Sequence, residues 1–145
     1  MTEIPDTESE EEVGTYYIPY LGVYRPDKCT TKFRVVFNES SKTTLENSLN
    51  SLQYNGWVIQ EDLFNIMTGF RKQIYAFVAD IKQMYRMILI DPTQTKLQRI
   101  LWREGVSEPV KMHEFKTVTY GTASAPDLAN RVLLQLSRYE HENYP

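Results

Sequence analysis

Cysteine is almost absent from this 145-residue chain, in which Cys29 stands alone. A single cysteine excludes an internal disulfide and a metal site built from several thiolates, and it favours a reducing intracellular compartment. No apolar run approaches the ~20 residues that a membrane-spanning helix needs. The first residues lack the basic flank and apolar stretch of a secretory signal, so we expect no export.

Basic residues are missing from the start of the chain. Residues 1–12 contain six acids and no base, and they lack apolar periodicity, so we predict a disordered acidic tail over residues 1–14. The formal net charge of the whole chain is -3, yet beyond residue 12 there are 16 bases against 13 acids. This mild basic excess is compatible with a polyanionic partner without requiring one.

Apolar and aromatic residues are plentiful, at 41% and 12% of the chain, which suffices for one globular domain with a core. Their spacing predicts an α+β fold of antiparallel strands with helices packed on one face. The predicted strands cover residues 16–24, 32–38, 74–80, 87–90, 97–103 and 110–118. The predicted helices cover residues 58–72 and 124–139, with a tight helical turn at 81–86 and a long polar loop at 38–56.

Asp80 ends the predicted strand 74–80, where a carboxylate is costly unless it pairs with a cation. Because Mg²⁺ prefers oxygen ligands, Asp80 is a candidate metal ligand, with the carbonyl oxygen of Ile81 as a second donor. The alternative is that Asp80 caps the turn after the strand. Tyr85 follows five residues later, and its ring is either the floor under a nucleotide sugar or an ordinary core aromatic.

Arg34 lies on the polar face of the predicted strand 32–38. Its guanidinium can grip a phosphate with two parallel hydrogen bonds, or it is an ordinary solvated arginine. Three nearby bases would add to a phosphate-attracting surface: Arg25, Lys28 and Lys32.

The segment from Tyr120 to Pro126 joins a predicted strand to a predicted helix. Gly121 lets the backbone approach a ligand closely, and free amides at the helix start would face a phosphate or a nucleotide. Ser124 and Asp127 have the spacing of a capping box, with Pro126 in the first turn. An ordinary strand-to-helix loop accounts for the same pattern.

The order of these segments resembles that of reverse transcriptases, the RNA-directed DNA polymerases, and in particular those of LTR retrotransposons of the BEL/Pao group. The likeness covers about residues 15–140 and rests on four motifs taken together, namely Thr31–Asn38, Ala79–Arg86, Gln98–Arg103 and Thr117–Pro126. It implies a fingers subdomain over residues 15–72 and an incomplete palm subdomain over residues 73–145.

The resemblance assigns a role to each candidate residue around the nucleotide. Asp80 matches the first catalytic aspartate, which holds Mg²⁺ together with the carbonyl of Ile81. Tyr85 matches the aromatic gate that favours deoxynucleotides, and Arg34 matches the fingers arginine that contacts the incoming dNTP. Lys28 is a candidate for the fingers lysine that accompanies it, and Arg25 is the other.

The resemblance also assigns the Tyr120–Pro126 segment. Tyr120 and Gly121 would lie against the nucleotide, while Gly121, Ser124 and Pro126 would support the RNA or DNA template and primer. In the intact polymerase the primer 3′-hydroxyl attacks the α-phosphate of the dNTP and releases pyrophosphate. Many reverse transcriptases have Gln in place of Tyr120 and Ser in place of Ala125, so the hydrogen bonds of those side chains are not expected here.

The family's second metal-binding element, an aromatic-x-Asp-Asp hairpin, has no counterpart, because the sequence contains no Asp-Asp pair. The remaining palm strands, the thumb and the RNase H domain are also expected in an intact enzyme and are absent. Since two-metal catalysis needs ligands for both cations, we predict no DNA synthesis by the chain alone. The alternative function is that of a non-catalytic remnant that binds nucleic acid or a protein.

Overall fold

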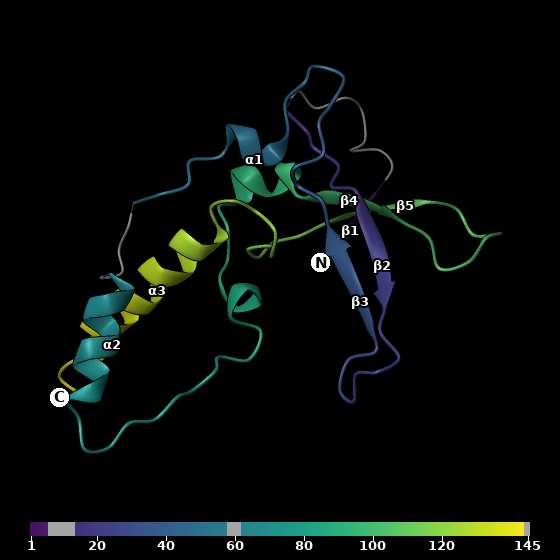
Figure 1. Cartoon of the computed structure of the whole chain (residues 1–145). Helices are drawn as coiled ribbons and strands as arrows, with labels where there is room; N and C mark the ends of the chain where they lie inside the picture. Colours follow the sequence, from purple (N-terminus) through teal and green to yellow (C-terminus); the bar gives the residue numbers. More distant parts are fainter. Residues whose placement is uncertain (6–13, 58–61, 144–145) are drawn as a thin grey trace.

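Within the described residues, two antiparallel sheets carry the β structure of this α+β chain (Figure 1). The computed structural model describes residues 1–5, 14–57 and 62–143. One sheet is a hairpin of β2 (Tyr20–Tyr24) and β3 (Phe33–Phe37). The other has the strand order β1-β5-β4, built from β1 (Thr2–Ile4), β5 (Lys111–Glu114) and β4 (Arg99–Trp102).

The hairpin and the strands β4 and β5 confirm the predictions made for these regions. Alternating side chains place Val35 and Phe37 on the half-buried face of β3 and Arg34 on the opposite face. The predicted strand 87–90 is reduced to one bridge between Leu89 and Thr117, flanked by a hydrogen bond of 2.9 Å from the Val118 amide to the Ile88 carbonyl.

The amino terminus corrects the prediction of a disordered tail over residues 1–14. Thr2–Ile4 forms β1, in which Ile4 is buried opposite Met112 and Glu3 forms an ion pair of 3.1 Å with Lys111. The acidic composition concealed Ile4, the one large apolar residue of β1, which pairs with the edge of β5. The rest of the predicted tail, residues 6–13, lies outside the described residues.

The core lies between the hairpin and β4. Ile18, Leu49 and Ile100 form its buried centre, and half-buried aromatic rings surround them. The Ile18 amide donates to the Arg99 carbonyl at 2.8 Å, so residues 16–18 run beside β4. Phe37 and Phe115 meet edge to face with ring centroids 5.2 Å apart, which joins the hairpin to the other sheet.

The prediction of a buried strand over residues 74–80 is wrong. The whole segment is exposed, with exposed fractions of 90% to 92% for its large apolar side chains, and none of it is a strand. In Figure 1 it runs as an extended trace from α2 (Leu63–Arg71) to the helical turn at residues 84–87, apart from both sheets. A strand is stabilised by neighbouring strands, and no described segment pairs with this one.

The helices differ from the predictions mainly at their boundaries. The helix α2 (Leu63–Arg71) confirms the prediction within its described part, but none of its residues is buried, so it is not packed on a sheet face. The 3₁₀ turn η2 (Met84–Met87) confirms the predicted helical turn and lies against α3 (Ala125–Glu140). Residues 58–61 of the predicted first helix lie outside the described part of the chain.

Two further helices lie elsewhere. The 3₁₀ turn η3 (Pro92–Leu97) begins where the Asp91 side chain accepts from the Thr93 amide at 2.8 Å. The short helix α1 (Leu49–Leu52) lies inside the segment 38–56, which was predicted to be entirely loop. Within the described residues no helix has the length and apolarity needed to cross a membrane.

Candidate nucleotide-binding loop

Two side chains hold the loop of residues 120–124 in place, one from α1 and one from the residue that follows it. Asn50 donates from Nδ2 to the Gly121 carbonyl at 3.0 Å and accepts from the Ala123 amide at 2.8 Å. Gln53, the C-cap of α1, accepts through Oε1 from the amide and the hydroxyl of Ser124, both at 3.3 Å. These contacts fix the backbone of the loop relative to α1.

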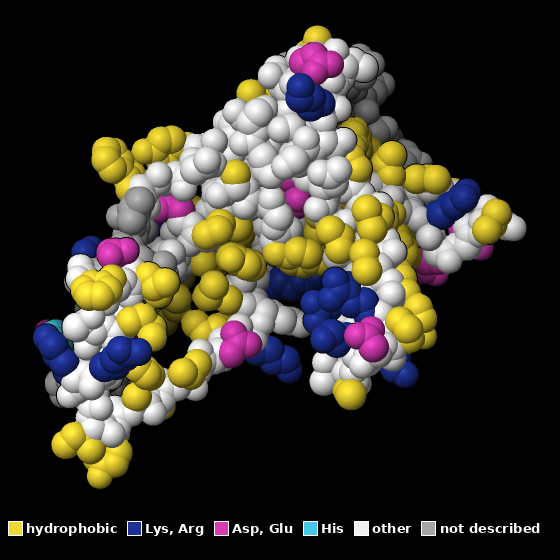
Figure 2. Space-filling view, in the orientation of Figure 1, with side chains coloured by type: hydrophobic (Ala, Val, Ile, Leu, Met, Phe, Trp, Pro, Cys, Tyr) yellow, Lys and Arg dark blue, Asp and Glu magenta, His cyan; other side chains and the backbone are white. Residues whose placement is uncertain are grey.

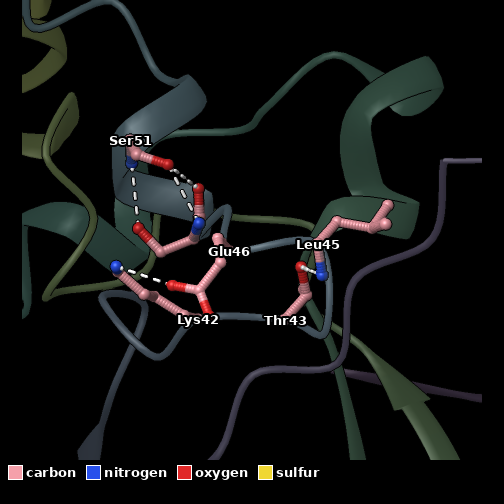
Figure 3. A network of polar contacts seen from close by, with 6 residues as sticks. Lys42, Thr43, Leu45, Glu46 and Ser51 are labelled. Carbon is pink, nitrogen blue, oxygen red and sulfur yellow. Dashed lines mark hydrogen bonds and ion pairs between the residues drawn. The ribbon is translucent and has the colours of Figure 1, made fainter.

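The helix α1 is itself fixed by local polar contacts. Ser48 and Ser51 form a reciprocal capping box, in which the Ser51 amide donates to the Ser48 hydroxyl at 3.1 Å. Figure 3 shows Ser51 at this cap and, in the preceding loop, Lys42 paired with Glu46 at 2.9 Å. Because the pair is exposed it adds little stability, whereas the cap sets where α1 begins.

Tyr120 joins the loop to the hairpin. Its hydroxyl donates to the Val35 carbonyl at 2.7 Å, across 85 positions of sequence, and its ring lies 5.2 Å from that of Phe37. These residues border a cavity of about 290 Å³ with mainly aromatic and aliphatic walls, and Arg86 of η2 brings a charge to its rim. The hairpin, the loop and η2 therefore meet at one place in the fold.

Glu39 lies beneath Gly121. Its side chain is 1% exposed, and its Oε1 has no hydrogen-bond partner among the described residues. Gly121 has φ +105, and a Cβ at this position would collide with the Glu39 carboxylate, so only glycine fits. Burial raises the pKa of the Glu39 carboxyl.

Replacement of Glu39 by Gln tests this buried charge. Because the pKa of Glu39 is raised in the folded chain, its contribution to stability is fully present below the ordinary value of 4.5 and is lost as the pH rises through the raised pKa. Glu39→Gln is therefore expected to increase the free energy of unfolding at pH 7 by on the order of 1 kcal/mol and to flatten its pH dependence.

Urea unfolding followed by circular dichroism from pH 4 to pH 8 measures this effect. Glu104→Gln, at an exposed position, serves as the control and should follow the wild-type pH profile. An unchanged profile in Glu39→Gln would show that the carboxylate is solvated in the folded chain.

Basic side chains gather on the hairpin. Four bases and one acid lie between residues 20 and 37, and Figure 2 shows Lys and Arg side chains over the hairpin and in the hollow beside it. Arg34 and Lys28 are both exposed, Arg34 on β3 opposite Val23 and Lys28 in the hairpin turn. Arg34 projects from the other face of β3 than Val35, so it does not enter the cavity beside Tyr120.

Asp80 and Tyr85 occupy different surroundings. Asp80 is exposed on the thread of residues 74–80, while Tyr85 is half-buried in η2. The Ile81 carbonyl, the predicted second metal donor, accepts from the Met84 amide at 3.3 Å. Over the described residues no group of three or more His, Cys, Asp or Glu side chains is placed to hold a metal ion.

The start of α3 corrects two predictions about residues 124–127. Ser124 does not cap the helix, because it already has helical dihedral angles and its hydroxyl bonds to Gln53 instead. The amides expected to be free are engaged, since Ala123, Ser124 and Ala125 donate to Asn50, Gln53 and Thr122.

The first turn of α3 does confirm its predicted Pro126. Asp127 occupies the same turn, paired with Arg131 at 2.8 Å and packed against Gly56, which has φ +81. A carboxylate at this position interacts favourably with the helix dipole, but it would repel a phosphate. Ser124 and Pro126 therefore contribute to the shape of the loop, and their role in supporting a template or primer stays a prediction.

Sequence reasoning missed the residues that hold the loop in place. Glu39, Asn50 and Gln53 lie in a segment predicted to be loop, and their partners are about 70 to 80 positions away. The spacing of Ser48 and Ser51 was a usable signal for α1. Nothing in the sequence pattern indicated which polar side chains would reach the loop.

Comparison with known proteins does not assign this chain to a family. No protein-family model matches the sequence, and no curated protein matches it.

Proposed function

We propose that this chain is the fingers and partial palm portion of a reverse-transcriptase-like polymerase of an LTR retrotransposon of the BEL/Pao group. One observation carries the proposal: the hydrogen bond of 2.7 Å from Tyr120 to the Val35 carbonyl. It brings together the hairpin and the strand-to-helix loop, two distant segments that such a polymerase uses around one nucleotide. The reaction of the complete enzyme would be intracellular transfer of dNTPs to a primer.

The candidate residues divide into two roles under this proposal. Arg34 and Lys28 on the exposed basic hairpin attract the phosphates of a dNTP or of the primer and template. Tyr120 offers a ring at the meeting point of the hairpin, the loop and η2, and Tyr85 is the half-buried aromatic of η2. Gly121 keeps the loop backbone open to close approach. Aromatic rings and arginines together are the usual means of holding nucleotides.

The described residues do not by themselves make a magnesium site. Asp80 and the Ile81 carbonyl offer two oxygen donors, and Mg²⁺ in polymerases takes one or two carboxylates with substrate phosphates. No group of three or more His, Cys, Asp or Glu side chains includes Asp80 within the described part of the chain. We therefore propose that this chain alone binds substrate without catalysing its transfer.

A second candidate function is non-catalytic binding of RNA or DNA. It is favoured by the same basic hairpin, which carries four bases and one acid between residues 20 and 37. It also agrees with the absence, over the described residues, of a group of three metal ligands that includes Asp80. The two functions predict the same contacts with phosphate and differ in whether the dNTP is recognised. Binding experiments separate them.

Titration of a fluorescent primer annealed to an RNA template, read by anisotropy, tests the proposal. The wild-type chain should bind with an affinity that falls steeply with salt, because phosphate contacts release counterions. Arg34→Ala is expected to weaken binding about fivefold at low salt and to reduce the slope of log affinity against log salt by about one.

Arg138→Ala is the matched control, since Arg138 is an exposed arginine in the last turn of α3 and is not part of the hairpin. Addition of the dNTP complementary to the template should tighten binding if the polymerase proposal is right, and it should have no effect on a simple RNA or DNA binder. Equal losses in the two variants, or binding that ignores salt, would contradict both functions.

A further inference from the structure

The exposed segment of residues 74–80 has the composition of a strand and no partner in the described chain. Its large apolar side chains are almost fully exposed, and the helix before it, α2, is exposed as well. Hydrophobic side chains continue over α2 and along this thread in Figure 2. Exposed apolar runs of this kind mark sites of association in proteins.

We propose that this segment pairs with the same segment of a second copy of the chain. The two strands run antiparallel with Ala76 opposite Ala76, so that residues 73–79 of each copy form a two-stranded sheet. Backbone amides and carbonyls exposed in one copy then find partners in the other. This interface includes Asp80 but not the hairpin or the loop of residues 120–124, which are the parts proposed to contact phosphate and nucleotide.

Symmetry limits the possible registers of such a pair. A closed dimer of identical chains has a two-fold axis, and the contact between residues i and j occurs twice. In an antiparallel pair, residues opposite each other lie on the same face of the sheet, and faces alternate along the strand. The axis therefore passes between a residue and its own copy, which leaves registers centred on a single residue.

Charge selects one of these registers. Centring on Ala76 places Lys72, the C-cap of α2, opposite Asp80 just beyond each end of the sheet, and symmetry forms this pair twice. Centring one residue earlier places Phe70 opposite Asp80, and centring one residue later places Lys72 opposite Lys82. Of these three registers, only the one centred on Ala76 opposes unlike charges, and both side chains are exposed and able to meet a partner.

Apolar side chains complement each other in the same register. On one face Tyr75 of each copy lies opposite Phe77 of the other, which gives two aromatic pairs. On the other face Ile74 lies opposite Val78, with the small Ala76 pair between them. Aromatic and β-branched cross-strand pairs of this kind are the favourable ones in antiparallel sheets.

Charge exchange between two positions tests the interface. Sedimentation equilibrium of the wild-type chain should show a reversible monomer–dimer equilibrium. Lys72→Glu and Asp80→Lys should each weaken it about tenfold, because each places like charges together twice, and the double variant should restore it. Circular dichroism checks that each variant keeps the wild-type secondary structure, which is expected because neither side chain is buried.

Crosslinking tests the register. In a Cys29→Ser background, Ala76→Cys should form a disulfide-linked dimer under mild oxidation, because the two cysteines are directly opposite. Ala79→Cys is the control, since its two copies would be about 20 Å apart at ~3.4 Å per residue.

Three results would overturn the proposal. A chain that stays monomeric at high micromolar concentration would show that the segment does not pair with its own copy. Failure of the double charge variant to recover dimerisation would show that Lys72 and Asp80 do not pair across the interface. If Ala79→Cys forms the disulfide-linked dimer as fast as Ala76→Cys does, the chains aggregate without a defined strand register.

Discussion

Gly121→Ala is expected to destabilise the chain by about 2 to 4 kcal/mol. Two physical terms contribute to this loss. Gly121 has φ +105, which residues with a Cβ rarely adopt, and the added methyl group would meet the carboxylate of the buried Glu39. Since Asn50 holds the Gly121 carbonyl at 3.0 Å, the loop cannot shift freely to relieve the collision. Urea unfolding followed by circular dichroism measures the change.

Gly69→Ala provides a control with the opposite sign. Gly69 lies in the exposed helix α2 and has open space where a Cβ would stand, so alanine should stabilise the helix by roughly 0.5 to 1 kcal/mol. A double-mutant cycle with Glu39→Ala then separates the collision from the backbone strain. The collision term disappears when the carboxylate is removed, whereas the strain term remains. Tolerance of alanine at residue 121 would contradict the described path of the loop.

Ile18→Ala is expected to cost about 2 to 5 kcal/mol of unfolding free energy. Ile18 is 2% exposed and belongs to the buried centre that joins residues 16–18, α1 and β4. Removing its outer carbons leaves a cavity that the surrounding aromatic rings can fill only in part. Because the same cluster supports α1, which holds the loop of residues 120–124, Ile18→Ala should also weaken binding of a primer and template.

Ile74→Ala is the matched substitution at a position that is 92% exposed. In dilute solution, where the chain is monomeric, it should change the unfolding free energy by no more than about 0.5 kcal/mol. A loss above 1 kcal/mol in the monomer would show that residues 74–80 are buried after all. The pair of variants therefore tests directly which part of the chain has a packed core.

Local sequence patterns predicted the elements whose stabilising contacts are close in sequence. The hairpin β2–β3 follows from the alternation over residues 32–38 and from the aromatic and β-branched residues before the Pro26 turn. The helix α3 follows from an apolar stripe and Pro126. The exposed Arg34 and the loop at Gly121 were predicted for the same reason. The helix α1 was missed because four residues carry too little periodicity to be seen.

Other predictions failed because they depended on partners that a local pattern does not contain. Residues 74–80 have the composition of a buried strand, but burial requires a neighbouring strand, and none of the described segments provides one. Ser124 has the spacing of a helix cap, but Gln53 competes for its hydroxyl. Ile4 lies in an acidic segment, but the open edge of β5 draws it into a sheet.

The sequence by itself determined the hairpin, its basic charge, the main helices and the apolar character of residues 74–80, because alternation, helical spacing and charge are properties of neighbouring residues. Only the tertiary structure decided that Glu39 lies beneath Gly121, that Asn50 and Gln53 hold the loop, and that Tyr120 reaches Val35. These contacts depend on packing between segments about 70 to 85 positions apart, whose geometry is set by the core around Ile18 and not by any local pattern.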